Sequence, residues 1–162
     1  MNTESAEYIL RFIMEKNLEE EKPERLNFLI NTEGGDVHHA FAIIDMINST
    51  SIPVHTFGIG NIYSSGLFMF MNGAKGHRYL FKNASLMSHQ WSTTYEGKQH
   101  ELESMGVESR NISDKIVRLY AECSGLSQTK VKHKFLSATD VYMTPDEAIK
   151  YGFADKIIDR FL

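Results

Sequence analysis

Two positions along the chain carry residue types that could perform acyl-transfer chemistry. Ser64 and Ser65 lie between two apolar segments, where a strand-to-helix junction could expose either hydroxyl as a nucleophile. Serine is also a common helix N-cap, and neither serine is the centre of a G-x-S-x-G pattern, so spacing alone does not choose between them. His89 ends another apolar run, where a histidine is either a general base for such a hydroxyl or a structural residue.

A third feature, the pair Gly34-Gly35, could stabilise negative charge. The two glycines follow an apolar run and precede a predicted helix. Backbone N–H groups at such a junction are free to hold an oxyanion or a phosphate. The alternative interpretation is an ordinary tight turn between a strand and a helix.

All these positions fall where a predicted element ends. The apolar run Leu26–Ile30 predicts a strand buried on both faces. Asp36 can cap a helix whose apolar face runs from Val37 to Ile47, and Val54–Ile59 predicts a second buried strand. A strand, a helix and a strand within about 35 residues form the right-handed crossover unit of a parallel sheet.

The alternation continues to the C-terminus and predicts an α/β fold in a single domain, residues 1–162. The other predicted elements are helices at Tyr8–Leu18 and Leu67–Met71, strands at Arg78–Phe81 and Ser85–Ser88, an amphipathic helix at Gln99–Cys123 ended by Gly125, a helix opened by the capping box Thr144-Pro145-Asp146-Glu147 and closed by Gly152, and a strand at Phe153–Ile158.

Composition excludes several classes of protein. With 17 basic and 21 acidic residues the net charge is −4, which provides none of the positive potential that nonspecific nucleic-acid binding requires. The single cysteine, Cys123, cannot form an internal disulfide, and no apolar run reaches the roughly 18 residues of a membrane span. The N-terminus lacks a signal-peptide pattern. We therefore expect a cytoplasmic protein that binds neither nucleic acid nor a membrane. Because adjacent histidines on a helix diverge, His38 and His39 predict no metal site.

Five runs of residues carry a resemblance to a known family: Ile30-Asn31-Thr32-Glu33-Gly34-Gly35, Gly60 through Gly66, Asn72-Gly73-Ala74-Lys75-Gly76-His77-Arg78, Met87-Ser88-His89-Gln90 and Tyr95-Glu96-Gly97-Lys98-Gln99. In order and spacing they resemble the proteolytic subunit of the Clp protease (ClpP) family, from about Glu7 to Ile158. The resemblance implies a crotonase/ClpP-like fold of repeated βαβ units in one domain, with a protruding handle at about residues 90–123.

The resemblance also implies a Ser-His-Asp triad: Ser64 as the nucleophile, His89 as the general base and Asp140 as the group that orients the imidazole. The backbone N–H groups of Gly35 and Ser65 would form the oxyanion hole. Gly34 and Val37 would bind substrate. No metal and no organic cofactor is implied.

Several positions depart from the family pattern. Ala138 and Thr139 stand where the family has a charged pair that bridges two rings, which weakens the expectation of ring-to-ring coupling. Trp91 replaces a proline, and Thr93-Thr94 replace glycines beside the expected cleft. The residues before Tyr8 are too few for the family's N-terminal segment, so the resemblance implies either a divergent, N-terminally short member of the family, such as a viral one, or a sequence from which part of the precursor is absent.

The expected function is a serine endopeptidase that cleaves unfolded proteins or peptides inside a ring chamber. The expected partners are further copies of the chain, in heptameric rings stacked as a tetradecamer, and an AAA+ Clp unfoldase, because the chain has no G-x-x-x-x-G-K-[ST] nucleotide loop of its own. Two alternatives stay open. One is a catalytically silent ClpP-like ring subunit that modulates an active paralogue, and the other is a crotonase-type acyl-CoA enzyme.

Overall fold

The computed structural model describes residues 1–161 as an α/β unit of six helices and six strands. The helices are α1 (Thr3–Leu18), α2 (Val37–Ser49), α3 (Ser65–Met71), α4 (Gln99–Ser124), α5 (Gln128–Lys134) and α6 (Pro145–Lys150). The strands are β1 (Leu26–Thr32), β2 (Val54–Tyr63), β3 (Arg78–Phe81), β4 (Ser85–Ser88), β5 (Val141–Met143) and β6 (Lys156–Ile158). No helix in this range is long and apolar enough to cross a membrane.

The long strand β2 organises the sheet. It pairs with β1 along one edge, while along the other edge β3 pairs with its first half, at Thr56–Gly58, and β4 with its second half, at Asn61–Tyr63. All these pairs are parallel, as is the pair of β3 with β6, whereas β5 runs antiparallel to β4. The carboxyl ends of β2 and β4 therefore meet at one edge of the sheet.

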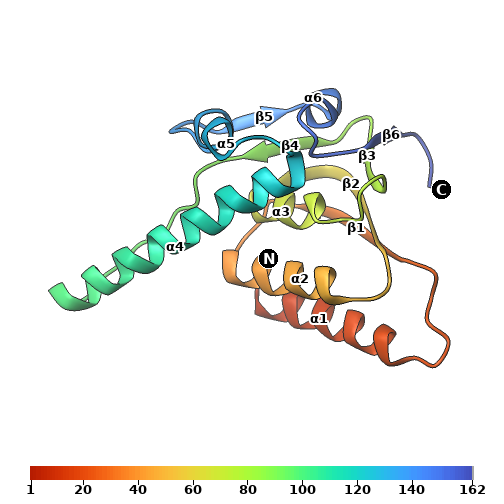
Figure 1. Cartoon of the computed structure of the whole chain (residues 1–162), viewed down its shortest axis with the longest axis horizontal. Helices are drawn as coiled ribbons and strands as arrows, with labels where there is room; N and C mark the ends of the chain where they lie inside the picture. The colour runs from red at the N-terminus through yellow and green to blue at the C-terminus, as the bar shows by residue number, and fades with distance from the viewer. Residues whose placement is uncertain (162) are drawn as a thin grey trace.

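Helices α1, α2 and α3 build the core in layers below the sheet (Figure 1). α1 packs on α2, α2 packs on α3, and α3 packs against β2. All seven residues of α3 are buried, because this short apolar helix is enclosed on every side. Only the C-terminal half of α4 packs on the core, through Ile112, Ile116 and Tyr120, and its N-terminal half extends away from the rest of the chain.

The structure confirms most elements predicted from the sequence and corrects the prediction that the strand at Leu26–Ile30 is buried on both faces. β1 is buried on one face only: Leu26 and Ile30 lie in the core with Phe28 packed against them, but Leu29 on the opposite face is 58% exposed. The helices cover the sheet at β1 from one side, where the Phe12 ring of α1 lies near Phe28.

The elements also differ from the sequence prediction in two notable boundaries and in two additional elements. α1 begins five residues earlier, at Thr3, since Asn2 and Ser5 form a reciprocal capping box. The last strand is limited to β6, since Asp155 turns to hydrogen-bond Arg78. The short elements α5 and β5 were not predicted, and neither carries a long periodic pattern.

Candidate active site

Ser64 occupies a strained turn between β2 and α3. Its φ and ψ angles are 54° and −125°, and within residues 1–161 it is the sole residue other than glycine with a positive φ. Such a conformation costs an L-residue about 1–3 kcal/mol and persists only where the surroundings enforce it. Here the Ser64 N–H donates to the Met87 carbonyl at 2.9 Å, which ties the turn to β4. A sharp strand-to-helix turn of this kind holds a side-chain hydroxyl clear of the sheet.

His89 follows β4 and meets Ser64 at the shared edge of the sheet. The parallel register of Tyr63 with Met87 brings the residues after each strand to the same level. The Oγ of Ser64 lies 2.7 Å from Nε2 of His89, so the hydroxyl can donate to the imidazole when Nδ1 carries the ring proton. A hydroxyl in this arrangement can lose its proton to the ring as it attacks an electrophile.

The residues on both sides of His89 are fixed to the C-terminal end of α5. The Ser88 hydroxyl donates to the Phe135 carbonyl at 2.7 Å. The Gln90 amide donates to the next carbonyl, that of Leu136, at 2.9 Å. These two hydrogen bonds, which we call the histidine clamp, hold the backbone of His89 from both neighbours. No sequence pattern indicates this role for Ser88 and Gln90, because it depends on the position of α5.

Two side chains of α4 that could ionise, Tyr120 and Cys123, stay protonated at neutral pH. The Tyr120 hydroxyl is 2.7 Å from the Ser88 Oγ. Because the Ser88 hydroxyl donates its own proton to the Phe135 carbonyl, Tyr120 must be the donor in this hydrogen bond. Burial raises the pKa of Tyr120 well above its ordinary value. Burial also raises the pKa of the Cys123 thiol to about 11, so Cys123 is not a thiolate nucleophile.

The Gly34-Gly35 turn lies directly against the Ser64 turn. Gly34 and Gly35 have φ angles of 101° and 136°, a region that favours glycine, and a Cβ on Gly34 would lie 2.8 Å from the Ser64 Cβ. The buried Ser65 hydroxyl donates to the Gly35 carbonyl at 3.1 Å and fixes the two turns together. Among the described residues, the backbone N–H groups of Gly35 and Ser65 have no hydrogen-bond acceptor. Two free donors beside the hydroxyl are what an oxyanion hole requires.

The backbone of Met1 also contacts this turn. Its amino group donates to the Gly34 carbonyl, and its carbonyl accepts the Asp36 N–H at 3.3 Å. These contacts engage the groups on either side of Gly35 and leave the Gly35 N–H itself free.

Asp140 lies on the exposed segment just before β5. The antiparallel register ends at Ser88 with Val141, and one further step would place Asp140 opposite His89. Within residues 1–161, however, the Asp140 carboxylate makes no hydrogen bond or ion pair with His89. The structure thus brings Ser64, His89 and the glycine turn together and leaves Asp140 at the neighbouring backbone position without contact to the ring.

The Ser64 hydroxyl and His89 open into a cleft of about 570 Å³, which Gly35 and Val37 also line. Asp36 lies on the same rim. Hydrogen bonds from the backbone N–H groups of His39 and His38 lower the pKa of Asp36, so its carboxylate caps α2 and is not available as a base. No three His, Cys, Asp or Glu side chains in residues 1–161 gather as metal ligands would.

Comparison with known proteins adds an independent line of evidence. A family model described as Clp protease matches residues 1–161. The chain belongs to the Clp protease family. It is 33% identical over 144 residues to the ATP-dependent Clp protease proteolytic subunit of Deinococcus radiodurans, an alignment that covers 88% of this chain and 70% of the relative.

Membership of the Clp protease family confirms the resemblance found in the sequence and, with the mixed α/β architecture, the crotonase/ClpP-like fold. It supports a ClpP-like peptidase activity for this chain. Subunits of the family form oligomeric rings and work with Clp ATPases. The roles of individual residues, the handle and the size of the ring stay predictions.

Proposed function

We propose that this chain is a serine endopeptidase that hydrolyses peptide bonds of unfolded proteins or peptides, like the proteolytic subunit of the ATP-dependent Clp protease. The observation that carries the proposal is the 2.7 Å separation of Ser64 Oγ and His89 Nε2 at a serine held with positive φ. A strained backbone that presents a hydroxyl to an imidazole is costly for stability, and it is the arrangement that acyl transfer needs.

The reaction begins when Ser64 Oγ attacks the scissile carbonyl carbon and its proton passes to Nε2 of His89. The carbonyl oxygen becomes an oxyanion that accepts hydrogen bonds from the N–H groups of Gly35 and Ser65. The imidazolium then gives its proton to the leaving amine as the C–N bond breaks, which leaves an acyl ester on Ser64. Water repeats the sequence, with His89 taking the proton of the water and returning it to Ser64.

We assign to Asp140 the task of accepting the Nδ1–H of His89. Its support is the register of β4 and β5, which if extended by one residue makes Asp140 the neighbour of His89. A hydrogen bond from Nδ1 of His89 to the Asp140 carboxylate would fix the imidazole in the tautomer whose Nε2 can act as a base.

The same proposal includes a homo-oligomer, in heptameric rings stacked as a tetradecamer, that receives substrate from an AAA+ Clp unfoldase. Large apolar side chains stand exposed in two regions of the single chain: Tyr8 and Leu29 at α1 and β1, and Leu102 and Val107 on the extended half of α4. Apolar surface of this kind is typical of surfaces that other subunits cover.

Labelling with a serine-directed fluorophosphonate, followed by peptide mapping, tests the proposal. We expect one adduct on Ser64 that is lost in Ser64→Ala and strongly reduced in His89→Ala. Ser65→Ala is the matched control, because its hydroxyl binds the Gly35 carbonyl and not the histidine, and it should still be labelled. An adduct on Ser65, or labelling that survives His89→Ala unchanged, would contradict the assignment.

One observation favours a second candidate, a catalytically silent ring subunit that modulates an active paralogue. The Asp140 carboxylate is not in contact with His89, so the imidazole of the single chain lacks its orienting group. In that case a folded, assembled wild-type protein gives no adduct and no peptide hydrolysis, and Asp140→Asn changes neither result. If the chain is an active peptidase, Asp140→Asn should lower kcat by several orders of magnitude.

A further inference from the structure

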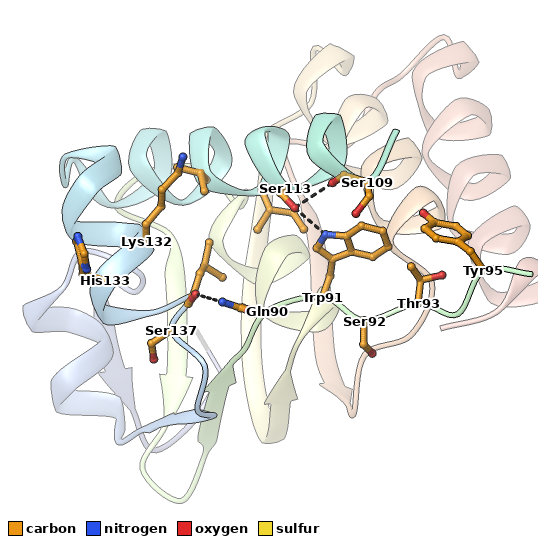
Figure 2. Close-up of a pocket in the computed structure, with 13 residues that line it drawn as sticks. Gln90, Trp91, Ser92, Thr93, Tyr95, Ser109, Ser113, Lys132, His133 and Ser137 are labelled. Atoms are coloured by element: carbon orange, nitrogen blue, oxygen red, sulfur yellow. Dashed lines mark hydrogen bonds between the residues drawn. The ribbon is translucent and has the colours of Figure 1, made fainter. Parts of the chain in front are cut away.

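Trp91 separates two neighbouring cavities. The first is the cleft of about 570 Å³ that contains Ser64 and His89, and the second has about 800 Å³ and contains neither residue. Both are lined by Trp91 and by Tyr95 from the extended segment after β4. Figure 2 shows the indole of Trp91 reaching across from this segment to α4, at the boundary of the larger cavity.

A hydrogen bond fixes the indole in this position. Nε1 of Trp91 donates to the Ser113 Oγ at 3.0 Å, and the Ser113 hydroxyl donates to the Ser109 carbonyl on the same helix at 3.0 Å. The Ser113 hydroxyl therefore donates one hydrogen bond within α4 and accepts one from the indole. Trp91 is half-buried and packs against the core, so the ring is held by contact as well as by the hydrogen bond.

The same helix lines both cavities on the two sides of the indole. Met105 and Ile112 of α4 face the cleft with the candidate catalytic groups, while Ile116 and Val117, the next turn, face the larger cavity. Without the indole, one apolar surface would continue along α4 from Ile112 to Ile116. Ser92, Thr93 and Tyr95 also line both cavities, but the indole is the shared group that is hydrogen-bonded to α4, so we take it as the wall between them.

We propose that Trp91 is a specificity-determining residue that limits the size of the substrate side chain next to the scissile bond. This inference rests on the proposed peptidase function. Val37, Met105 and Ile112 form an apolar part of the cleft, which suits an aliphatic side chain, while Asp36 and Glu108 also line it. The indole forms one wall of this cleft next to Ser64 and His89, so we expect aliphatic side chains to be accepted better before the scissile bond than the larger rings of phenylalanine or naphthylalanine.

The test uses blocked tetrapeptides with a coumarin leaving group that differ only in the last residue: Ala, Leu, Phe or naphthylalanine. Wild type should prefer Ala and Leu. In Trp91→Ala the ratio of kcat/KM for Phe to that for Leu should rise at least about tenfold, because an apolar pocket discriminates by size through steric exclusion. Trp91→Phe keeps most of the wall and should retain the wild-type order of preference.

Two serine variants distinguish the effect of the Trp91 indole on substrate size from general effects of substitutions on α4. Ser113→Ala removes the hydrogen bond to the indole and should relax the size limit partly. Ser104→Ala is the matched control, since the Ser104 hydroxyl also donates to the carbonyl four residues earlier but touches neither cavity. It should leave all four rates unchanged.

A binding measurement makes the result independent of turnover. Dye-labelled peptides of the same series are titrated by fluorescence anisotropy against Ser64→Ala, with and without Trp91→Ala. A gain for Phe and naphthylalanine peptides in the double variant supports the inference even if the chain is catalytically silent, whereas missing fluorophosphonate labelling counts against the proposed function alone. An unchanged Phe-to-Leu ratio in folded Trp91→Ala, or an equal loss for all peptides, overturns the inference.

Discussion

Replacing Ser64 by glycine should make the protein more stable than replacing it by alanine. An L-residue in the left-handed region costs about 1–2 kcal/mol, and alanine at φ 54° keeps that cost while glycine removes it. Glycine loses about 0.4–1 kcal/mol in return, because it makes the unfolded chain more flexible. We therefore expect the free energy of unfolding of Ser64→Gly to be about 0.5–1 kcal/mol greater than that of Ser64→Ala. Both variants lack the hydroxyl that binds His89, so its loss does not contribute to the difference.

Thermal unfolding at one protein concentration and one oligomeric state measures this difference. For a chain of this size about 1 kcal/mol corresponds to roughly 2–4 °C in Tm, so Ser64→Gly should melt about 2 °C above Ser64→Ala. Ser104 on the exposed face of α4 provides the opposite control, since glycine in a helix interior is about 1 kcal/mol worse than alanine. If glycine is the less stable substitution at both positions, the backbone of Ser64 is not strained and the argument for an enforced nucleophile turn is wrong.

Three further substitutions test other parts of the structure. Gly34→Ala should lower kcat about 10²-fold or more, because its Cβ would press on Ser64, the proposed nucleophile, beside the proposed oxyanion hole. Gly76→Ala, with φ +86° and open space around it, is the control and should keep activity. Burial alone would raise the pKa of Asp155, but hydrogen bonds from Arg78 outweigh it and the pKa is lowered. Asp155→Asn should therefore lower the free energy of unfolding, measured with urea at pH 7, by about 3 kcal/mol. This difference from wild type should narrow only as the pH falls below about 4, and an equal difference at pH 3 would refute the prediction. Burial lowers the pKa of His55, so wild-type stability should decline as pH falls below about 6.5, and His55→Phe should flatten that decline in urea titrations at pH 7.5 and 5.0.

The position of the candidate site was predictable because it depends on strand ends. Parallel strands place their carboxyl ends at one edge, so Ser64 after β2 and His89 after β4 had to come close once the strands were located. The glycine turn was predictable for the same reason. Spacing did not choose between Ser64 and Ser65, and only the family resemblance pointed to Ser64, because the choice depends on which residue takes the positive φ and which hydroxyl turns to the Gly35 carbonyl.

The one-sided burial of β1 and the presence of α5 and β5 could not be predicted from the sequence. The run Leu26–Ile30 has the same apolar letters whether helices cover one face or two, so the exposure of Leu29 could be seen only in three dimensions. α5 has seven residues and one buried side chain, Val131, which gives no periodic signal. The place of the Asp140 carboxylate depends on the loop before β5, whose conformation no local pattern sets.

The histidine clamp has a consequence for the biosynthesis of the chain. Gln90 binds a carbonyl 46 residues further along the sequence, in the last third of the protein. At about 5–20 residues per second, a ribosome needs roughly 2–9 s to add that stretch after it has made the histidine. During this interval the growing chain is itself an unfolded polypeptide, the material that the finished enzyme would cleave. If His89 is the base of the proposed site, it is not anchored until Phe135 and Leu136 have been made, and the nascent chain would be spared from cleavage by its own site.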